Sequence, residues 1–287
     1  MVSLDVEPRF GVLGSERGWG PRMDFKLHEY THIVVGKAQE FRPGEHGGTS
    51  DARRQFDCYV RVLKELNLDV VEVDFGVEFP DNIFLEDLVI VCHGIVLLLK
   101  PTTPEEEQVL KVLRKVLQKD LGQTIVELTD PNAKLAGSDV LFTGREFFVG
   151  ISETSNEAGA NAVAEAFPEY PCVPITMPDE VHHLKKYVSV AGPDILCMAA
   201  CEDTTDIIKR MEREANYAYK TLTVPEEEAS NCLYVNGTLI HRAIEEIPKS
   251  FKIFCERIDF ARRSICFSEL ASMSTGLTAF SLLVRNP

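Results

Sequence analysis

The chain has 287 residues, 45% of them hydrophobic, which is enough for one or two domains with a buried core. Its formal net charge of -15 argues against binding to a nucleic-acid backbone, which selects basic surfaces. The N-terminal residues mix acidic and basic side chains where a secretion signal would need an apolar core, and the longest apolar run, 88–99, is too short to cross a bilayer. We therefore expect a soluble cytoplasmic protein that binds neither nucleic acid nor a membrane.

Eight cysteines are present, and in the expected intracellular setting their thiols stay reduced. Their spacing contains no C-x-x-C pair, and the sequence has no H-E-x-x-H motif, so a zinc site has little support. We expect no metal and no other cofactor.

Residues 1–27 carry Gly, Pro and mixed charge without periodicity, and we interpret them as a flexible extension before a single domain, 28–287. Hydrophobic periodicity and turn residues predict a series of elements along that domain. In chain order they are a strand at 31–35, a loop at 36–51 that is long enough for a lid, a helix at 52–66, a strand at 70–73, a hairpin at 88–99, a helix from 103 to 121, a hairpin at 140–149, a helix at 158–167, a hairpin at 187–200, a helix from about 205, and hairpins at 232–240 and 277–285.

The clearest of these signals is GSDVLFTGREFFVG, Gly137–Gly150, in which two apolar runs flank a short polar connection that contains Gly144. The helix that begins after Thr103 has an equally clear start, because Pro104 stands in its first turn and Glu106 completes a capping box. Gly122 is expected to end that helix.

Equivalent positions of the hairpins recur at intervals of about 45 to 50 residues, and a repeat of that length is typical of stacked or closed arrays. Five units result if the strand near Thr31 pairs with the strand near Leu283. We therefore predict an α/β fold, a propeller of five ββαβ units with pseudo-fivefold symmetry around a central channel. Closure of the ring would remove exposed sheet edges.

Four acidic residues open the predicted hairpins: Asp81, Glu86, Asp87 and Asp139. Each of them alone would more often cap a turn or face solvent. Together at the mouth of a channel they would bind a cation, and a planar guanidinium suits paired carboxylates best. His182 and His183 follow Pro178, and one of them is a candidate general acid or base, although a surface or core histidine is the commoner case.

Several motifs resemble the dimethylarginine dimethylaminohydrolase family, and they run in that family's order over nearly the whole chain. They are PDNIFLED (80–87), NAKLAGSDVLFTGREFFVGIS (132–152), HLK (183–185), AGP (191–193) and SEL (268–270). The resemblance implies the pentein fold of guanidine-modifying proteins, which is a five-unit αβ propeller. It also implies a cysteine thiolate that attacks the guanidinium carbon of methylated arginine, and a histidine that protonates the departing amine and then activates water, leaving citrulline.

The resemblance assigns roles to some residues that this chain retains. Asp81, Glu86 and Asp87 stand where the family's acids hold the guanidinium, and Asp139 keeps its place in the same block. His183 matches the general acid and base.

Four positions depart from the family's pattern. Ala136 replaces the acid that would orient the histidine, and Glu106 and Thr154 replace two arginines that would hold the substrate's carboxylate. Counting from SEL without a gap, Ala279 stands at the position of the nucleophilic cysteine, and Cys266 would need a different register. Since alanine has no nucleophile, the sequence predicts a loss of several orders of magnitude in rate.

Three interpretations remain open from the sequence. The chain is a non-catalytic member of this family that binds a cationic guanidino compound, or it is an active hydrolase in which a native cysteine at 279 was replaced by alanine. The active form would act on a substrate without an α-carboxylate, because both arginines are absent. A third interpretation is an interaction module that binds a protein partner or forms a homodimer.

Overall fold

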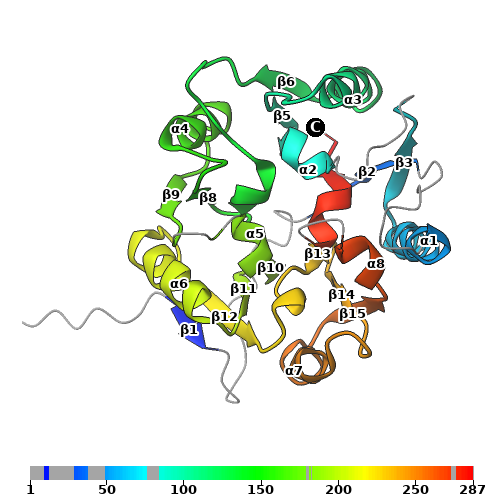
Figure 1. Ribbon diagram of the computed structural model, residues 1–287, viewed down its shortest axis with the longest axis vertical. Coiled ribbons are helices and arrows are strands. Elements are labelled where there is room, and N and C mark those ends of the chain that lie inside the picture. The colour runs from blue at the N-terminus through cyan, green and yellow to red at the C-terminus, as the bar shows by residue number, and fades with distance from the viewer. Residues whose placement is uncertain are drawn as a thin grey trace, which may run out of the picture.

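The computed structural model describes residues 10–12, 29–37, 49–75, 84–178, 181, 183–272 and 276–286. The fold is a mixed α/β structure with five separate small sheets, and its longer helices lie on the outside of the molecule (Figure 1). Among the helices of the described ranges, none is long and apolar enough to cross a membrane.

All five sheets share one connectivity, in which a first strand pairs antiparallel with a second and the second pairs in parallel with a third. In the order first, second, third, they are β16 (Ser281–Val284), β2 (His32–Gly36) and β3 (Asp69–Val73); β4 (Val89–Cys92), β5 (Ile95–Leu98) and β6 (Thr124–Glu127); β7 (Val140–Phe142), β8 (Phe147–Ile151) and β9 (Cys172–Thr176); β10 (Val188–Gly192), β11 (Ile195–Ala199) and β12 (Tyr219–Val224); β13 (Leu233–Val235), β14 (Thr238–Arg242) and β15 (Ala261–Ile265).

Each sheet has two kinds of helix attached to it. A longer helix connects the second strand to the third: α1 (Thr49–Glu65), α3 (Pro104–Lys115) with its continuation η2 (Val116–Asp120), α4 (Glu157–Ala166), α6 (Glu202–Glu214) and α7 (Pro248–Arg257). A helix of about one turn precedes the first strand: α2 (Leu85–Leu88), η3 (Gly137–Asp139), α5 (Leu184–Tyr187), η4 (Glu227–Ala229) and η5 (Leu277–Phe280). A further short helix, α8 (Ser268–Ala271), lies before η5 in the chain.

Four of the five hairpins that the sequence predicted are confirmed: 88–99, 140–149, 187–200 and 232–240. The predicted hairpin at 277–285 is wrong, because Leu277–Phe280 form the helix η5 and only Ser281–Val284 form a strand, β16, whose antiparallel partner is the distant β2. In the 137–150 hairpin, Val140 pairs with Val149 and Phe142 with Phe147, and Gly144 has a φ of 91° in the connection. Helix α3 begins with the predicted capping box, since the Thr103 side chain accepts a hydrogen bond from the Glu106 backbone N–H at 3.2 Å. The chain leaves η2 at Gly122, whose φ of 64° favours glycine.

The first strand after residue 28 and the last strand of the chain's described part meet in one sheet, as predicted, because Leu283 of β16 pairs with Ile33 of β2. The expectation that closure removes sheet edges is wrong, since each of the five sheets is open and keeps two edge strands. One of those edges is extended by β1 (Phe10–Val12), a strand that lies within the N-terminal segment and pairs in parallel with β12.

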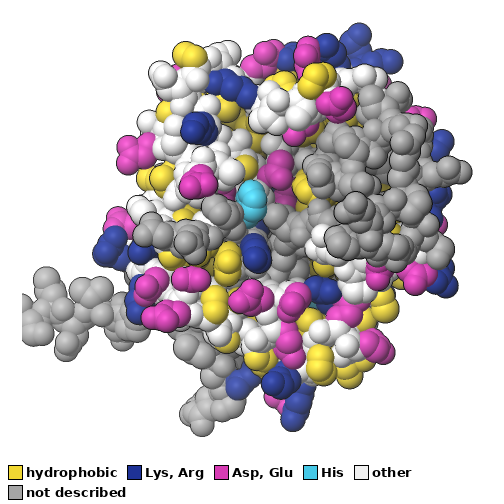
Figure 2. All heavy atoms as spheres, viewed as in Figure 1, with side chains coloured by type: hydrophobic (Ala, Val, Ile, Leu, Met, Phe, Trp, Pro, Cys, Tyr) yellow, Lys and Arg dark blue, Asp and Glu magenta, His cyan; other side chains and the backbone are white. Residues whose placement is uncertain are grey.

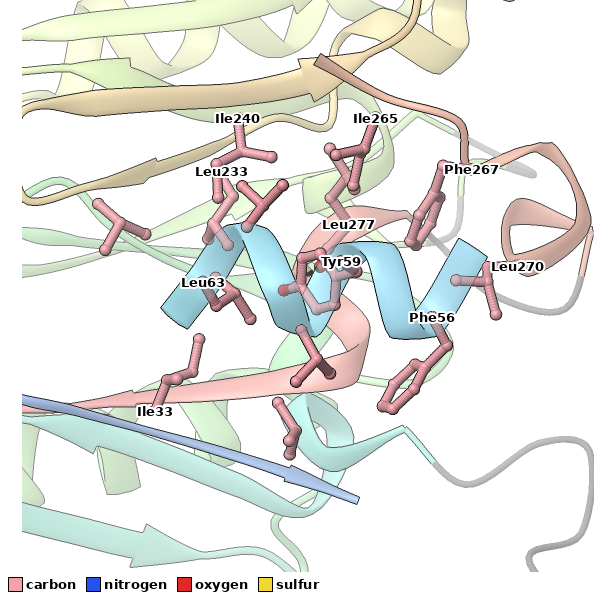
Figure 3. Packing of buried hydrophobic residues seen from close by; sticks show 14 of the residues in the cluster. Ile33, Phe56, Tyr59, Leu63, Leu233, Ile240, Ile265, Phe267, Leu270 and Leu277 are labelled. Atoms are coloured by element: carbon pink, nitrogen blue, oxygen red, sulfur yellow. Dashed lines mark hydrogen bonds between the residues drawn. The ribbon is translucent and has the colours of Figure 1, made fainter. Parts of the chain in front are cut away.

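Helix α1 shows how the sheets and helices form the core. Its Phe56, Tyr59 and Leu63 are spaced three and four residues apart, so they share one face, and they are nearly or fully buried. Figure 3 shows these side chains packed among apolar residues from β2, β13, β14, β15 and η5. Tyr59 also donates through its hydroxyl to the Leu277 carbonyl oxygen at 3.1 Å, so the packing of α1 fixes η5.

Candidate functional site

Three one-turn helices meet where the sequence predicted a convergence of polar residues. Gly137 of η3 lies so close to α2 that a Cβ atom there would be 1.7 Å from the Glu86 carbonyl oxygen, and only glycine permits this approach. The Ser138 backbone N–H donates to Asp87 Oδ1 at 2.9 Å. On the other side, the Leu184 N–H donates to Asp139 Oδ1 at 3.1 Å, which joins η3 to α5.

Asp139 is fully buried, and its carboxylate is used within the protein. Oδ2 accepts hydrogen bonds from the hydroxyls of Ser152 at 3.1 Å, Thr154 at 2.8 Å and Ser155 at 2.6 Å. The Leu184 N–H is the fourth donor, so the donors match the roughly four acceptor positions of the carboxylate. The geometry is that of an anchor between β8, η3 and α5.

Asp87 and Glu86 form an acidic pair in α2, in which Asp87 is half-buried and Glu86 is buried. Burial raises the pKa of Asp87 above its ordinary value and the charge of Glu86 raises it further, while hydrogen bonds from Ser138 and the charge of His183 act in the opposite direction. Glu86 is 4% exposed, and Lys185 Nζ lies 3.0 Å from its Oε2. One of the two carboxylates is therefore partly neutralised by a cation of the protein.

His183 stands at the start of α5 with a φ of 65°, a strained value for a residue other than glycine. Its Nδ1 lies 2.7 Å from Oγ of Ser138, which is fully buried. A serine hydroxyl thus contacts the ring that an acid was expected to orient. Ala136 lies two residues earlier, and its N–H donates to Ser155 Oγ at 3.0 Å.

The contact between Ser138 and His183 could not be predicted from motif positions alone. The sequence does contain a signal, because Ser138 is a polar residue two positions after Ala136 in the same block. Ala136, where the resemblance predicted an acid, lies in the same block as Ser138, and only the folded structure brings the Ser138 hydroxyl to the ring.

Ala279 is fully buried in η5 and offers no nucleophile. The hydroxyls beside it are already engaged, since Thr278 Oγ1 accepts from Asn231 Nδ2 at 3.1 Å and Ser281 Oγ lies 2.8 Å from the Tyr59 hydroxyl. Burial raises the pKa of the Cys266 thiol, which disfavours its thiolate form.

Glu106 and Thr154, where the resemblance predicted two arginines, serve local structure. Glu106 completes the cap of α3, where its Oε2 accepts from the Thr102 hydroxyl at 2.8 Å and from the Thr103 N–H at 3.3 Å. Thr154 donates to the buried Asp139. Asp81, His182 and most of the 36–51 loop lie outside the described residues.

A cavity of about 160 Å³ lies beside this cluster of short helices. Glu86, Lys185 and Thr278 contribute to its lining. The rest is largely apolar, and the first strand of every sheet contributes: Val89 of β4, Val140 of β7, Ser189 of β10, Leu233 of β13 and Leu282 of β16. Figure 2 shows a histidine at the middle of one face of the molecule, with acidic and basic side chains around it.

No family model matches the chain, but individual proteins of known sequence or structure are similar to it. It is 31% identical over 261 residues to putative hydrolase DDAH2 of Bos taurus, a match that covers 88% of this chain and 86% of the bovine protein. It is 26% identical to N(G),N(G)-dimethylarginine dimethylaminohydrolase of Streptomyces coelicolor over 71% of this chain and 75% of that protein. Among solved structures, a mutant of DDAH from Pseudomonas aeruginosa complexed with citrulline has the same fold, with a TM-score of 0.71, 20% identity and coverage of 89% and 99%.

Proposed function

Because the chain belongs to the dimethylarginine dimethylaminohydrolase family, we propose that it binds a cationic guanidino compound at the Glu86–Asp87 pair without hydrolysing it. The observation that carries this proposal is the buried methyl group of Ala279, a residue that the sequence resemblance assigns to the position of the family's nucleophile. With the neighbouring hydroxyls of Thr278 and Ser281 in hydrogen bonds, no side chain of η5 replaces the missing thiolate.

The proposal includes the five-unit arrangement. The five sheets repeat one connectivity, and their first strands line a common cavity, which supports a propeller of the pentein type with pseudo-fivefold symmetry around a central channel. In this arrangement the one-turn helices stand together at one mouth of the channel. That mouth is the ligand site.

Asp87 is the main ligand group in this proposal, and Asp81 contributes a further carboxylate. Within the described residues, Asp87 accepts a hydrogen bond only from Ser138, so its carboxylate keeps free acceptor positions for a planar guanidinium. Glu86 shares its charge with Lys185 and therefore contributes less. Since Glu106 and Thr154 stand in place of the two arginines, the preferred ligand lacks an α-carboxylate.

His183 and Ser138 explain why the remaining groups catalyse poorly. A carboxylate beside Nδ1 would stabilise the imidazolium that a general acid needs, whereas a neutral hydroxyl fixes the ring without supplying that charge. The site therefore positions a guanidinium carbon near a histidine but does not supply the attacking group, and the group at Nδ1 of the ring is a neutral hydroxyl.

Turnover and binding should be measured on the same preparation. We expect no citrulline from N(G),N(G)-dimethylarginine, while calorimetry detects binding of 1,1-dimethylguanidine. Citrulline production by the chain as given would refute the proposed lack of catalysis, and absence of dimethylguanidine binding would refute the ligand site.

Ala279→Cys tests the alternative of an active hydrolase with a replaced nucleophile. We expect this variant to remain without turnover, because positions 136, 106 and 154 still lack the acid and the two arginines. Substantial hydrolysis of dimethylarginine or of a guanidine without a carboxylate would instead favour the active form.

A further inference from the structure

A second cavity, of about 220 Å³, lies between α5, η4, the end of β14, α8 and η5. Within the described residues, it shares no lining residue with the cavity beside the candidate site. We propose that this second cavity is a binding site for a zwitterionic amino acid with a small apolar side chain. The proposal is independent of the proposed guanidinium site.

Arg242 is the group that would hold the carboxylate. It lines the cavity and is only 8% exposed. Its Nε donates to Glu246 Oε2 at 2.6 Å, and among the described residues this is the guanidinium's only hydrogen bond. With respect to the part of the chain that the structure describes, the two terminal NH₂ groups therefore keep their donors available, and a planar fork of donors is suited to a carboxylate.

The position of Arg242 is fixed before any ligand arrives. Glu246, its partner, accepts hydrogen bonds through Oε1 from the backbone N–H groups of Phe267 at 2.7 Å and Ser268 at 3.0 Å. The ion pair is thus tied to the chain that leads into α8. A guanidinium held in this way loses little rotational freedom on binding, which favours affinity.

The charges around the cavity distinguish a zwitterion from a simple anion. Two cations, Lys186 and Arg242, and two exposed acids, Glu227 and Glu228, line it. An anion would meet the acidic side chains, and a cation would meet Arg242. A zwitterion satisfies both, with its carboxylate at Arg242 and its ammonium group at Glu227 and Glu228.

The remaining lining sets the size and polarity of the ligand. Phe267, Ala271 and Leu277 form an apolar portion of the wall. The volume of about 220 Å³ is below the range of about 300 to 1,000 Å³ that is usual for drug-sized ligands. The cavity therefore suits a molecule of the size of a single amino acid with an aliphatic side chain.

The test uses the full chain and three matched probes: L-norvaline, pentanoate, which lacks the ammonium group, and L-norvalinamide, which lacks the carboxylate. We expect calorimetry to detect norvaline, and we expect both analogues to bind at least about tenfold more weakly, since each loses one charged contact. Pentanoate binding as tightly as norvaline, or no binding of norvaline, would overturn the proposal.

Variants locate the binding. Arg242→Gln should abolish norvaline binding, but Arg242 is buried, so its folding must be checked by circular dichroism. The double variant Glu227→Gln and Glu228→Gln alters only exposed residues and should weaken norvaline about threefold to tenfold without weakening pentanoate. Unchanged norvaline affinity in the double variant would contradict the site.

Asp87→Asn serves as the matched control, because it should impair dimethylguanidine binding and leave norvaline binding intact.

Discussion

Asp139 and Asp87 occupy matching places in the fold, each in a one-turn helix directly before the first strand of its sheet. Their carboxylates are nevertheless used differently. Asp139 is fully buried and accepts from three hydroxyls and one backbone N–H, whereas Asp87 is half-buried and, within the described residues, accepts from Ser138 alone. An acid at the mouth of a hairpin is therefore an anchor or a ligand group according to the donors that surround it.

The largest expected effect is on the anchor. Asp139→Ala removes the acceptor for four donors, three of which come from the segment after β8, and should lower the free energy of unfolding by about 3 kcal/mol or more. Urea denaturation measures the loss. Asp120→Ala, at an exposed aspartate, is the control and should change stability by less than about 0.5 kcal/mol. If both variants are equally stable, Asp139 is not an anchor.

A smaller effect, on binding, is expected at the other aspartate. Asp87→Asn should weaken 1,1-dimethylguanidine at least about tenfold, equivalent to about 1.4 kcal/mol, because it removes the charge opposite the guanidinium. Its stability should stay close to that of the parent chain, since one backbone donor is involved and the amide oxygen can still accept from it. An unchanged dissociation constant would show that Asp87 does not contact the ligand.

Ser138→Ala should have a smaller effect again. It should lower the free energy of unfolding by about 1 kcal/mol, which is typical of the loss of one hydrogen bond. Its more specific consequence is a change in the tautomer populations of His183, because the hydroxyl that fixes Nδ1 is lost. Nitrogen-15 chemical shifts of the imidazole report this change. Ser264→Ala, at an exposed serine, should leave those shifts unaltered, and identical spectra for Ser138→Ala would contradict the positioning role.

The weakest effect concerns pH. The raised pKa of Asp87 means that the folded chain takes up this proton at a higher pH than the unfolded chain does. Its contribution to stability should therefore increase as pH falls through the folded pKa, and the increase should be complete below the ordinary value of 3.8. Comparing the parent chain with Asp87→Asn between neutral pH and that value isolates this contribution, and identical pH profiles would contradict it.

Much of the fold could be predicted because its signals are local. Gly144 and the Asn236-Gly237 pair mark tight turns, and Thr103 with Glu106 marks a helix start, each within a few residues. Strand β15 was missed because its Ala261–Ile265 segment is mostly polar and exposed, so it lacks the alternation of a half-buried strand. The long helix α7 was missed as well.

The candidate site, like the fold, could be predicted from the sequence only in part. Motif positions identified Glu86, Asp87 and His183, but not the partners of these residues. Ser138 and His183 are 45 positions apart, and Lys185 and Glu86 are 99 apart. Spacing along the chain contains no information about such contacts, because the meeting of separate one-turn helices creates them.

The pairing of β16 with β2 also has a consequence for the growing polypeptide. Thr31 and Val284, which are joined by a backbone hydrogen bond, stand 253 positions apart. On the ribosome, the sheet that contains β2 and β3 therefore lacks its first strand until almost the whole chain has been synthesised. The apolar face of α1 packs against η5, so it stays uncovered until η5 has also been synthesised. This region therefore completes its folding late and is exposed to aggregation during synthesis.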